Sequence, residues 1–250
     1  MKKKPTKIYL DYAAATPLEP AVSSLIQKVY KEDFASPSSI HGFGVKAKNR
    51  LDRARKDIAG ILGAHDDEII FTSGSTESNN LAILGVIKFY GSFPHIVTTN
   101  IEHSSVLEVF RHLEKTKQAE VTYVPVEKNG IVDPKKIRKA LKANTVLVSV
   151  MYANSEIGTV QPLREIAKEI RHFNKKNDKK ARQVYFHTDA TQAINYLPLH
   201  VEKLGVDLMS LSGVKIYGPK GVGVFYIRRR TKIEKVMLGG DQQFDMRAGS

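Results

Sequence analysis

Amphipathic segments and short β-branched runs alternate along most of the chain, and this alternation limits the fold more than any other feature. Apolar residues recur with a period near 3.6 over residues 20–31, 44–63, 76–89, 104–115, 134–142 and 162–174, which predicts helices there. Runs rich in Val, Ile, Thr, Tyr and Phe predict strands at residues 69–71, 95–98, 121–124, 146–150, 184–186, 208–210 and 222–227. Because strands that alternate with helices form βαβ units, we expect an α/β fold with a mostly parallel sheet and helices on both faces.

The composition is that of a globular protein without disulfide bonds. Hydrophobic residues make up 42% of the chain and charged residues 26%, and Cys is absent from all 250 positions. No apolar run reaches the roughly 20 residues that a membrane-spanning helix needs. The basic start at Lys2 is typical of a signal peptide, but Asp11 interrupts the apolar stretch that should follow it. We therefore expect one large cytoplasmic domain with no membrane contact.

The net charge of +13 raises the question of nucleic-acid binding. Much of the excess lies in three local groups, at residues 2–4, 175–182 and 228–230, which fall at the terminus or at joints between periodic segments. No zinc-finger Cys and no aromatic-rich ribonucleoprotein motif accompanies these groups. We predict a solvated basic surface and no nucleic-acid partner. Binding to anionic partners is the alternative.

One turn of the chain has the features of an anion site. Ligands of an open α/β sheet bind beyond the carboxyl ends of the strands. There, residues 72–76 form a turn rich in Gly and hydroxyl groups, with Ser75 and Thr76 opening a predicted helix. Free amides and the positive dipole end of that helix fit a phosphate, but neither a P-loop nor a GxGxxG motif is present to indicate a nucleoside triphosphate. The alternative is ordinary N-capping by Ser or Thr.

Two further strands are followed by polar residues whose role the pattern alone leaves open. Glu102-His103-Ser104 follows the strand at 95–98, and Asn154-Ser155 follows the strand at 146–150. His103 is a candidate for catalysis, and a core histidine bonded to a backbone carbonyl is the alternative. We predict no metal site, because HExxH is absent and no third ligand can be named beside His187 and Asp189.

The pairing of Asp189 with Lys215 carries the most chemical information. Asp189 follows the strand at 184–186, and Lys215 follows the strand at 208–210. An acid and a lysine at neighbouring strand ends, with an anion site at another strand, match the three anchors of pyridoxal phosphate. The acid keeps the pyridine nitrogen protonated, and the amine attacks the aldehyde, which Arg cannot do. Taken singly, Asp189 as a helix cap and Lys215 as a surface lysine are the alternatives.

Five stretches then resemble a known family. They are residues 8–17 (Ile-Tyr-Leu-Asp-Tyr-Ala-Ala-Ala-Thr-Pro), 36–39 (Ser-Pro-Ser-Ser), 71–77 (Phe-Thr-Ser-Gly-Ser-Thr-Glu), 212–221 and 239–250. In order and spacing they resemble the pyridoxal-phosphate-dependent cysteine desulfurases of the class V aminotransferase group. The resemblance implies that residues 1–250 form the large, cofactor-binding domain of a fold-type I pyridoxal-phosphate transferase. Residues 1–20 would pack toward a smaller C-terminal domain.

The resemblance also implies a role for individual residues. Lys215 corresponds to the Schiff-base lysine, Asp189 to the partner of the pyridine nitrogen, and His103 to the imidazole stacked on the ring. Lys215 and His103 are the expected proton carriers. The other expected cofactor contacts are Gln192 to the ring hydroxyl, Ser155 beside the ring, Ser75, Thr76 and Ser212 to the phosphate, and Ser250 to the phosphate of the partner subunit. The last contact implies a homodimer.

The chain departs from the family pattern at several positions. Ser155, preceded by Asn154, stands where the family usually has the ring-side Asn, and Val214 replaces a His before the lysine. Residues 242–247 replace a Glu and a Gly that are common in the family. We also expect the small C-terminal domain to be absent from residues 1–250, together with its nucleophilic cysteine and its substrate-binding arginine.

The expected function is therefore that of a cysteine desulfurase-like protein. Such an enzyme converts L-cysteine to L-alanine and passes the sulfur to an acceptor or scaffold protein for iron–sulfur cluster or thio-cofactor assembly. A chain without Cys cannot supply the nucleophile, so we expect residues 1–250 to be inactive alone. Two alternatives are another class V aminotransferase or lyase, which needs no thiol, and a non-catalytic basic scaffold.

Overall fold

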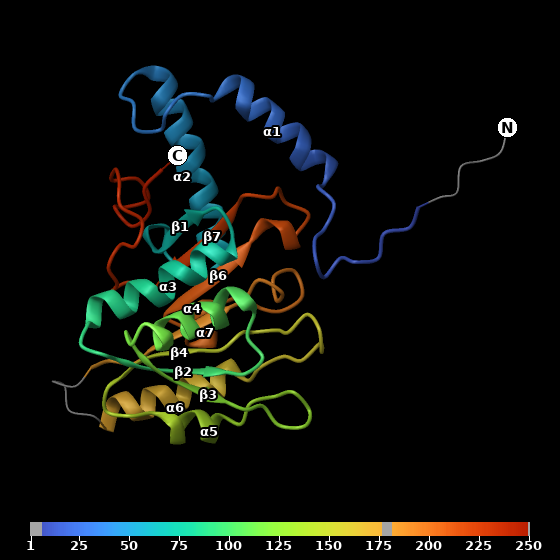
Figure 1. Cartoon of the computed structure of the whole chain (residues 1–250). Coiled ribbons are helices and arrows are strands. Elements are labelled where there is room, and N and C mark those ends of the chain that lie inside the picture. The colour runs from blue at the N-terminus through green and yellow to red at the C-terminus, as the bar shows by residue number, and fades with distance from the viewer. Residues whose placement is uncertain (1–6, 177–181, 250) are drawn as a thin grey trace.

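The chain folds into a seven-stranded sheet covered by helices, as Figure 1 shows. The computed structural model describes residues 7–176 and 182–249. The strands are β1 (Ile69–Thr72), β2 (His95–Thr99), β3 (Glu120–Val124), β4 (Thr145–Ser149), β5 (Tyr185–Asp189), β6 (Leu208–Ser212) and β7 (Gly223–Ile227). The helices are α1 (Pro20–Glu32), α2 (Gly42–Leu62), α3 (Ser75–Tyr90), α4 (Ser104–Lys115), α5 (Pro134–Ala140), α6 (Leu163–Lys176) and α7 (Val201–Leu204), with 3₁₀ turns η1 (Asp66–Glu68) and η2 (Gly213–Lys215).

The order of strands brings the predicted site residues to one edge of the sheet. The order is β1-β7-β6-β5-β4-β2-β3, and only β7 runs opposite to the other strands. The carboxyl ends of β1, β2, β4, β5 and β6 therefore lie along the same edge. Ligands bind at that edge in open sheets of this kind.

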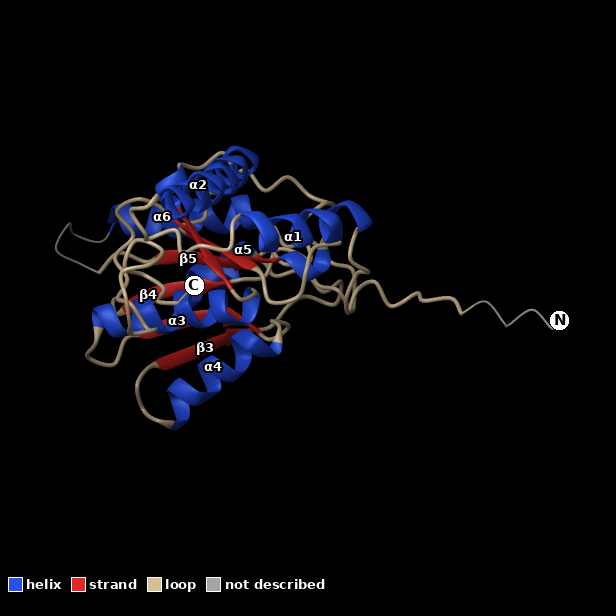
Figure 2. Ribbon diagram, turned by 90° about the horizontal axis from the view of Figure 1, so that it is seen from above, coloured by secondary structure: helices blue, strands red, loops and turns tan. Residues whose placement is uncertain are grey.

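Two apolar cores lie on the two faces of the sheet. Helices α3 and α4 cover one face, where Ile83 and Phe110 are fully buried. Helices α2, α5, α6 and α7 cover the other face, where Leu62 and Ile166 are buried. Figure 2 shows the strands between these two layers of helices. The predicted fold class is therefore confirmed.

Every predicted helix and strand is present, with ends that differ from the prediction by three residues or fewer. The antiparallel direction of β7 was not predicted. It follows β6 after a connection of ten residues, which is too short for a parallel crossover. Helix α7 was also missed, because its single turn, Val201–Leu204, is too short to show a period.

The basic groups and the membrane prediction can be compared with the structure in part. Residues 2–4, Lys179 and Lys180 lie outside the described residues. Arg228 pairs with Glu202 and Asp207, and Arg229 pairs with Asp67, so these arginines are engaged within the chain. Within residues 7–176 and 182–249, no helix is both long and apolar enough to cross a membrane.

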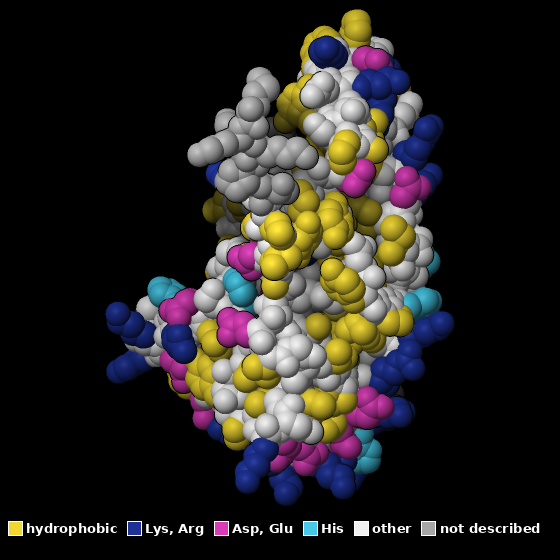
Figure 3. Space-filling model, turned by 90° about the vertical axis from the view of Figure 1, so that its right-hand side faces the viewer, with side chains coloured by type: hydrophobic (Ala, Val, Ile, Leu, Met, Phe, Trp, Pro, Cys, Tyr) yellow, Lys and Arg dark blue, Asp and Glu magenta, His cyan; other side chains and the backbone are white. Residues whose placement is uncertain are grey.

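Residues 7–19, here called the N-terminal segment, extend away from the sheet and expose apolar side chains. Thr16 ties it to the loop after β6, since its N–H and its hydroxyl both donate to the carbonyl of Val214 (3.0 and 2.9 Å). Ile8 and Leu10 are 79% and 84% exposed. Figure 3 shows apolar side chains gathered on the face of the molecule from which this segment extends.

Candidate functional site

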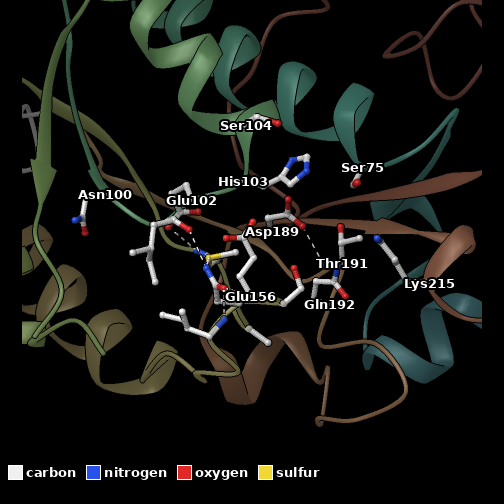
Figure 4. Close-up of a pocket in the computed structure, with 16 residues that line it drawn as sticks. Ser75, Asn100, Glu102, His103, Ser104, Glu156, Asp189, Thr191, Gln192 and Lys215 are labelled. Carbon is white, nitrogen blue, oxygen red and sulfur yellow. Dashed lines mark hydrogen bonds between the residues drawn. The ribbon is translucent and has the colours of Figure 1, made fainter. Parts of the chain in front are cut away.

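A cavity of about 480 Å³ opens at the carboxyl edge of the sheet. Six of the predicted residues line it: Ser75, His103, Ser155, Asp189, Gln192 and Lys215. Figure 4 shows the side chains of His103, Asp189 and Lys215 directed toward the same space. Thr76 lines an adjacent cavity instead, Ser212 is buried behind the turn at Gly74, and Ser250 lies outside the described residues.

Asp189 ends β5 as a buried carboxylate with two donors. The side-chain nitrogen of Asn79 donates to its Oδ2 (2.8 Å), and the backbone N–H of Thr191 donates to its Oδ1 (3.0 Å). The second contact is a local turn and not a helix cap, because the next helix after β5 is α7 at Val201–Leu204. Two donors leave acceptor capacity on a carboxylate for a third.

Lys215 lies in η2, directly after β6, under the N-terminal segment. Its Nζ donates to the carbonyls of Ala13 (2.6 Å) and Ala14 (2.7 Å). Burial lowers the pKa of its ammonium group, and the nearby carboxylates of Asp11 and Asp189 offset only part of that decrease. The ion is thus easier to deprotonate than an ordinary lysine. A surface lysine in a loop is therefore the wrong interpretation of this residue.

The predicted anion site is the N-terminus of α3. The residue before it, Gly74, has φ = 152° and gives the helix no side-chain cap, so N-capping by Ser or Thr is the wrong alternative. The first amides of a helix have no partner within it, and they carry the positive end of its dipole. The backbone here is crowded, because a Cβ on Gly223 would lie 2.5 Å from the Cα of Gly74. Glycine at 223 lets the turn approach β7.

His103 is the residue before α4, and its ring is exposed rather than buried in the core. Its Nδ1 accepts the backbone N–H of Ser105 (3.1 Å) and lies 2.8 Å from the hydroxyl of the same residue. A core histidine bonded to a carbonyl is thus wrong. The Ser105 hydroxyl lies 2.8 Å from the side-chain nitrogen of Asn79, which connects His103 to Asp189. Sequence reasoning missed Asn79 and Ser105.

Glu102 is a second acid at the cavity, and its role was also missed. Its Oε1 accepts the hydroxyl of Thr99 (2.6 Å) and the N–H of Met151 (2.9 Å), whereas Oε2 has no partner among the described residues. Burial is the main reason that the pKa of this carboxyl rises to about 8. Glu102 is therefore a neutral acid at pH 7. Only its position next to His103 could have drawn attention to it.

The residues described by the structure contain no group of three His, Cys, Asp or Glu side chains that could hold a metal ion. His187, named above beside Asp189, is buried between the hydroxyls of Ser149 (2.8 Å) and Ser210 (3.1 Å). Burial lowers its pKa to about 4, so it is a neutral part of the polar interior.

Two positions that depart from the family pattern, Ser155 and Val214, are each next in sequence to a residue that lines the cavity. Asn154, the neighbour of Ser155, is committed to a turn, because its Oδ1 accepts the N–H groups of Glu156 (2.8 Å) and Ile157 (3.1 Å). Ser155 itself lines the cavity. Val214 has no polar side chain, but its carbonyl binds the N-terminal segment, as described above.

Comparison with known proteins identifies the family. A model of the family described as aminotransferase class-V matches residues 8–249. The chain belongs to the aminotransferase class-V family. Class V aminotransferases use pyridoxal phosphate as cofactor.

The relatives of this chain include proteins named cysteine desulfurase. It is 47% identical to cysteine desulfurase IscS of Dictyoglomus turgidum over 98% of the chain and 60% of the relative, and 45% identical to the cysteine desulfurase of Homo sapiens over 97% and 52%. Among solved structures, it resembles SspA in complex with cysteine (TM-score 0.90, 36% identity, 97% of this chain and 68% of the other). It also resembles a NifS-like protein (0.91, 37%, 98% and 65%). The chain thus spans little more than half the length of these curated relatives.

Proposed function

We propose that this chain is the pyridoxal-phosphate-binding part of a cysteine desulfurase. The reaction would be L-cysteine plus a thiol giving L-alanine plus a persulfide, so that the carbon–sulfur bond breaks and a sulfur–sulfur bond forms. The observation that carries the proposal is the convergence of Lys215, Asp189 and the free amides of α3 on one cavity. The names of the relatives support the choice of cysteine as substrate.

The residues of the cavity fit pyridoxal phosphate. The phosphate would bind the N-terminal amides of α3 with Ser75, Thr76 and Ser212, where the backbone offers donors and no side chain caps the helix. The pyridine nitrogen would donate to Asp189, whose carboxylate has acceptor capacity left. The ring face would lie against His103, with Gln192 and Ser155 at its edge. When bound, the cofactor supplies an electron sink for the α-carbon of an amino acid.

Lys215 would hold the cofactor and move a proton. An amine attacks an aldehyde only as the neutral base, and burial lowers the pKa of this lysine toward that form. The carbonyls of Ala13 and Ala14 accept hydrogen bonds from Nζ and hold it at the cavity. His103, exposed at the cavity, would be the second proton carrier.

Some parts of the proposed enzyme must come from outside these 250 residues. The sequence has no Cys, so the thiol that takes the sulfur is supplied elsewhere. The exposed apolar side chains of the N-terminal segment support packing against further protein, including the small domain of the family. We place the enzyme in the cytoplasm, as a homodimer in which Ser250 would reach the partner's phosphate, with sulfur passed to an acceptor for iron–sulfur cluster or thio-cofactor assembly.

Borohydride reduction of the cofactor-loaded chain tests this proposal. The pyridoxyl label should be fixed on Lys215, and Lys215→Ala should lose the saturable yellow complex. Lys220→Ala, which removes an exposed lysine nearby, is the matched control and should keep it. A label spread over surface lysines, with none specific to Lys215, would contradict the proposal.

The same sample then tests the reaction. Given L-cysteine without added thiol, the loaded chain should form no more alanine than free pyridoxal phosphate does, because no protein thiol is present to take the sulfur. Alanine well above that background would show that a second molecule of L-cysteine, itself a thiol, takes the sulfur as a persulfide in place of a protein thiol. That result would contradict the expectation that residues 1–250 are inactive alone.

A further inference from the structure

A continuous row of hydrogen bonds joins Asp189 to His103. The row runs from Asp189 Oδ2 to Asn79 Nδ2 (2.8 Å), from Asn79 Nδ2 to Ser105 Oγ (2.8 Å) and from Ser105 Oγ to His103 Nδ1 (2.8 Å). Asn79 is fully buried and Ser105 is 9% exposed. The two residues come from different helices, α3 and α4, and water has little access to the hydrogen bonds between them.

The charge of Asp189 sets the direction of every bond in this row. A carboxylate only accepts, so the Asn79 amide must turn its nitrogen toward it. The second hydrogen of that nitrogen is donated to the oxygen of Ser105. The one hydroxyl hydrogen of Ser105 is then left for His103 Nδ1, which becomes an acceptor.

Two further observations agree with this direction. The backbone N–H of Ser105 also donates to His103 Nδ1 (3.1 Å), and a protonated Nδ1 could not accept it. The carbonyl oxygen of Asn79 is buried and has no partner in the part of the chain that the structure describes. A buried polar atom without a partner is costly, and turning the amide to satisfy it would face oxygen against carboxylate. The orphaned oxygen is thus the result of an amide orientation imposed by Asp189.

We propose that Asn79 and Ser105 are positioning residues that transmit the charge of Asp189 to His103 and fix its neutral ring with the hydrogen on Nε2. Nε2 is then the nitrogen that donates into the cavity, and Nδ1 is unavailable for proton transfer. The tautomer follows from the chain's own contacts. Its use in moving a proton rests on the function proposed above.

The tautomer is measurable without cofactor or substrate. In the chain purified free of cofactor and labelled with ¹⁵N-histidine, two-bond nitrogen–proton spectra distinguish the two neutral tautomers. The signals of His103 among the eight histidines are assigned by their loss in His103→Gln. We expect the pattern of hydrogen on Nε2. Hydrogen on Nδ1 in the unsubstituted chain would overturn the inference, whatever the variants do.

Variants test the transmission itself. In Ser105→Ala one of the two donors to Nδ1 is lost, so the ratio of the Nε2–H to the Nδ1–H form should fall about fivefold, as expected for one neutral hydrogen bond. Asp189→Asn removes the charge at the other end of the row. The Asn79 amide can then exchange the positions of its oxygen and nitrogen, so the same ratio should fall. Ser104→Ala is the matched control, since this exposed hydroxyl makes no hydrogen bond within the described residues, and the His103 signals should not change.

The same variants could also contradict the inference. An unchanged ratio in both Ser105→Ala and Asp189→Asn would show that the backbone N–H alone sets the tautomer. Because these spectra need no cofactor, that result is distinguishable from failure of the borohydride test. A chain that shows the expected tautomer but does not bind pyridoxal phosphate would refute only the proposed function.

Discussion

Replacing Glu102 with Gln should remove a large pH dependence from the stability of this chain. Gln is close in size to Glu, and its oxygen can still accept from the Thr99 hydroxyl and the Met151 N–H. Unlike Glu102, it stays neutral at every pH. The substitution therefore tests the ionisation of the buried acid rather than its packing.

The size of the effect follows from the shift in pKa. Burial raises the pKa of Glu102 to about 8 in the folded chain, against 4.5 for an ordinary glutamic acid. The folded state therefore binds a proton that the unfolded state has already lost. Stability from this group is fully present below pH 4.5 and is lost as the pH rises toward 8. Between pH 5 and pH 7 the loss from Glu102 alone is about 2.5 kcal/mol.

Urea unfolding at pH 5, 6 and 7 measures this loss. The stability of Glu102→Gln relative to the unsubstituted chain should rise steadily over that range, by about 2.5 kcal/mol in all. Glu108→Gln, at a side chain 65% exposed on α4, is the control and should leave the pH profile of stability unchanged. Parallel profiles for Glu102→Gln and the unsubstituted chain would refute the interpretation of Glu102 as a neutral buried acid.

Two further substitutions test the turn between β1 and α3 and the ion pair between Glu77 and Arg247. Gly223→Ala places a Cβ 2.5 Å from the Cα of Gly74, so it should lower the free energy of unfolding in urea by about 1–3 kcal/mol. It should also reduce any stabilisation of the folded chain by added inorganic phosphate. Gly60→Ala, with open space around its Cβ, is the control and should have neither effect. Arg247→Met should destabilise the chain by about 2–3 kcal/mol, because it leaves the largely buried carboxylate of Glu77 without its ion pair (2.8 Å). Adding Glu77→Gln should recover part of that loss, and a double variant less stable than Arg247→Met would count against the ion pair as its cause.

Periodicity predicted the fold well because packing on a sheet depends mainly on which side chains are apolar. In β7, Phe225 faces the core under α3, while Val224 and Tyr226 face the opposite core, as the alternation of a strand buried on both faces requires. The direction of a strand cannot be predicted in the same way. The reversal of β7 depends on the length and path of the connection before it, and no apolar pattern distinguishes a parallel from an antiparallel strand.

The positions of Asp189 and Lys215 at one edge of the sheet could be predicted from the sequence, whereas the contacts of Asn79 and Ser105 could not. Asp189 and Lys215 follow strands directly, so topology alone brings them to the same edge. Asn79 and Ser105 lie on two helices whose contact brings their polar atoms together, and no local pattern marks either of them. Glu102 differs again, since its pKa depends on burial that only the packed structure reveals.

The two buried acids of the cavity, Asp189 and Glu102, differ in the donors that reach their carboxyl oxygens. Asp189 has a donor on each carboxylate oxygen. Glu102 has both of its donors on one oxygen and none on the other, so burial outweighs them and raises its pKa to about 8. The placement of the donors, on both oxygens of Asp189 but on one oxygen of Glu102, thus gives two neighbouring buried carboxyls different surroundings.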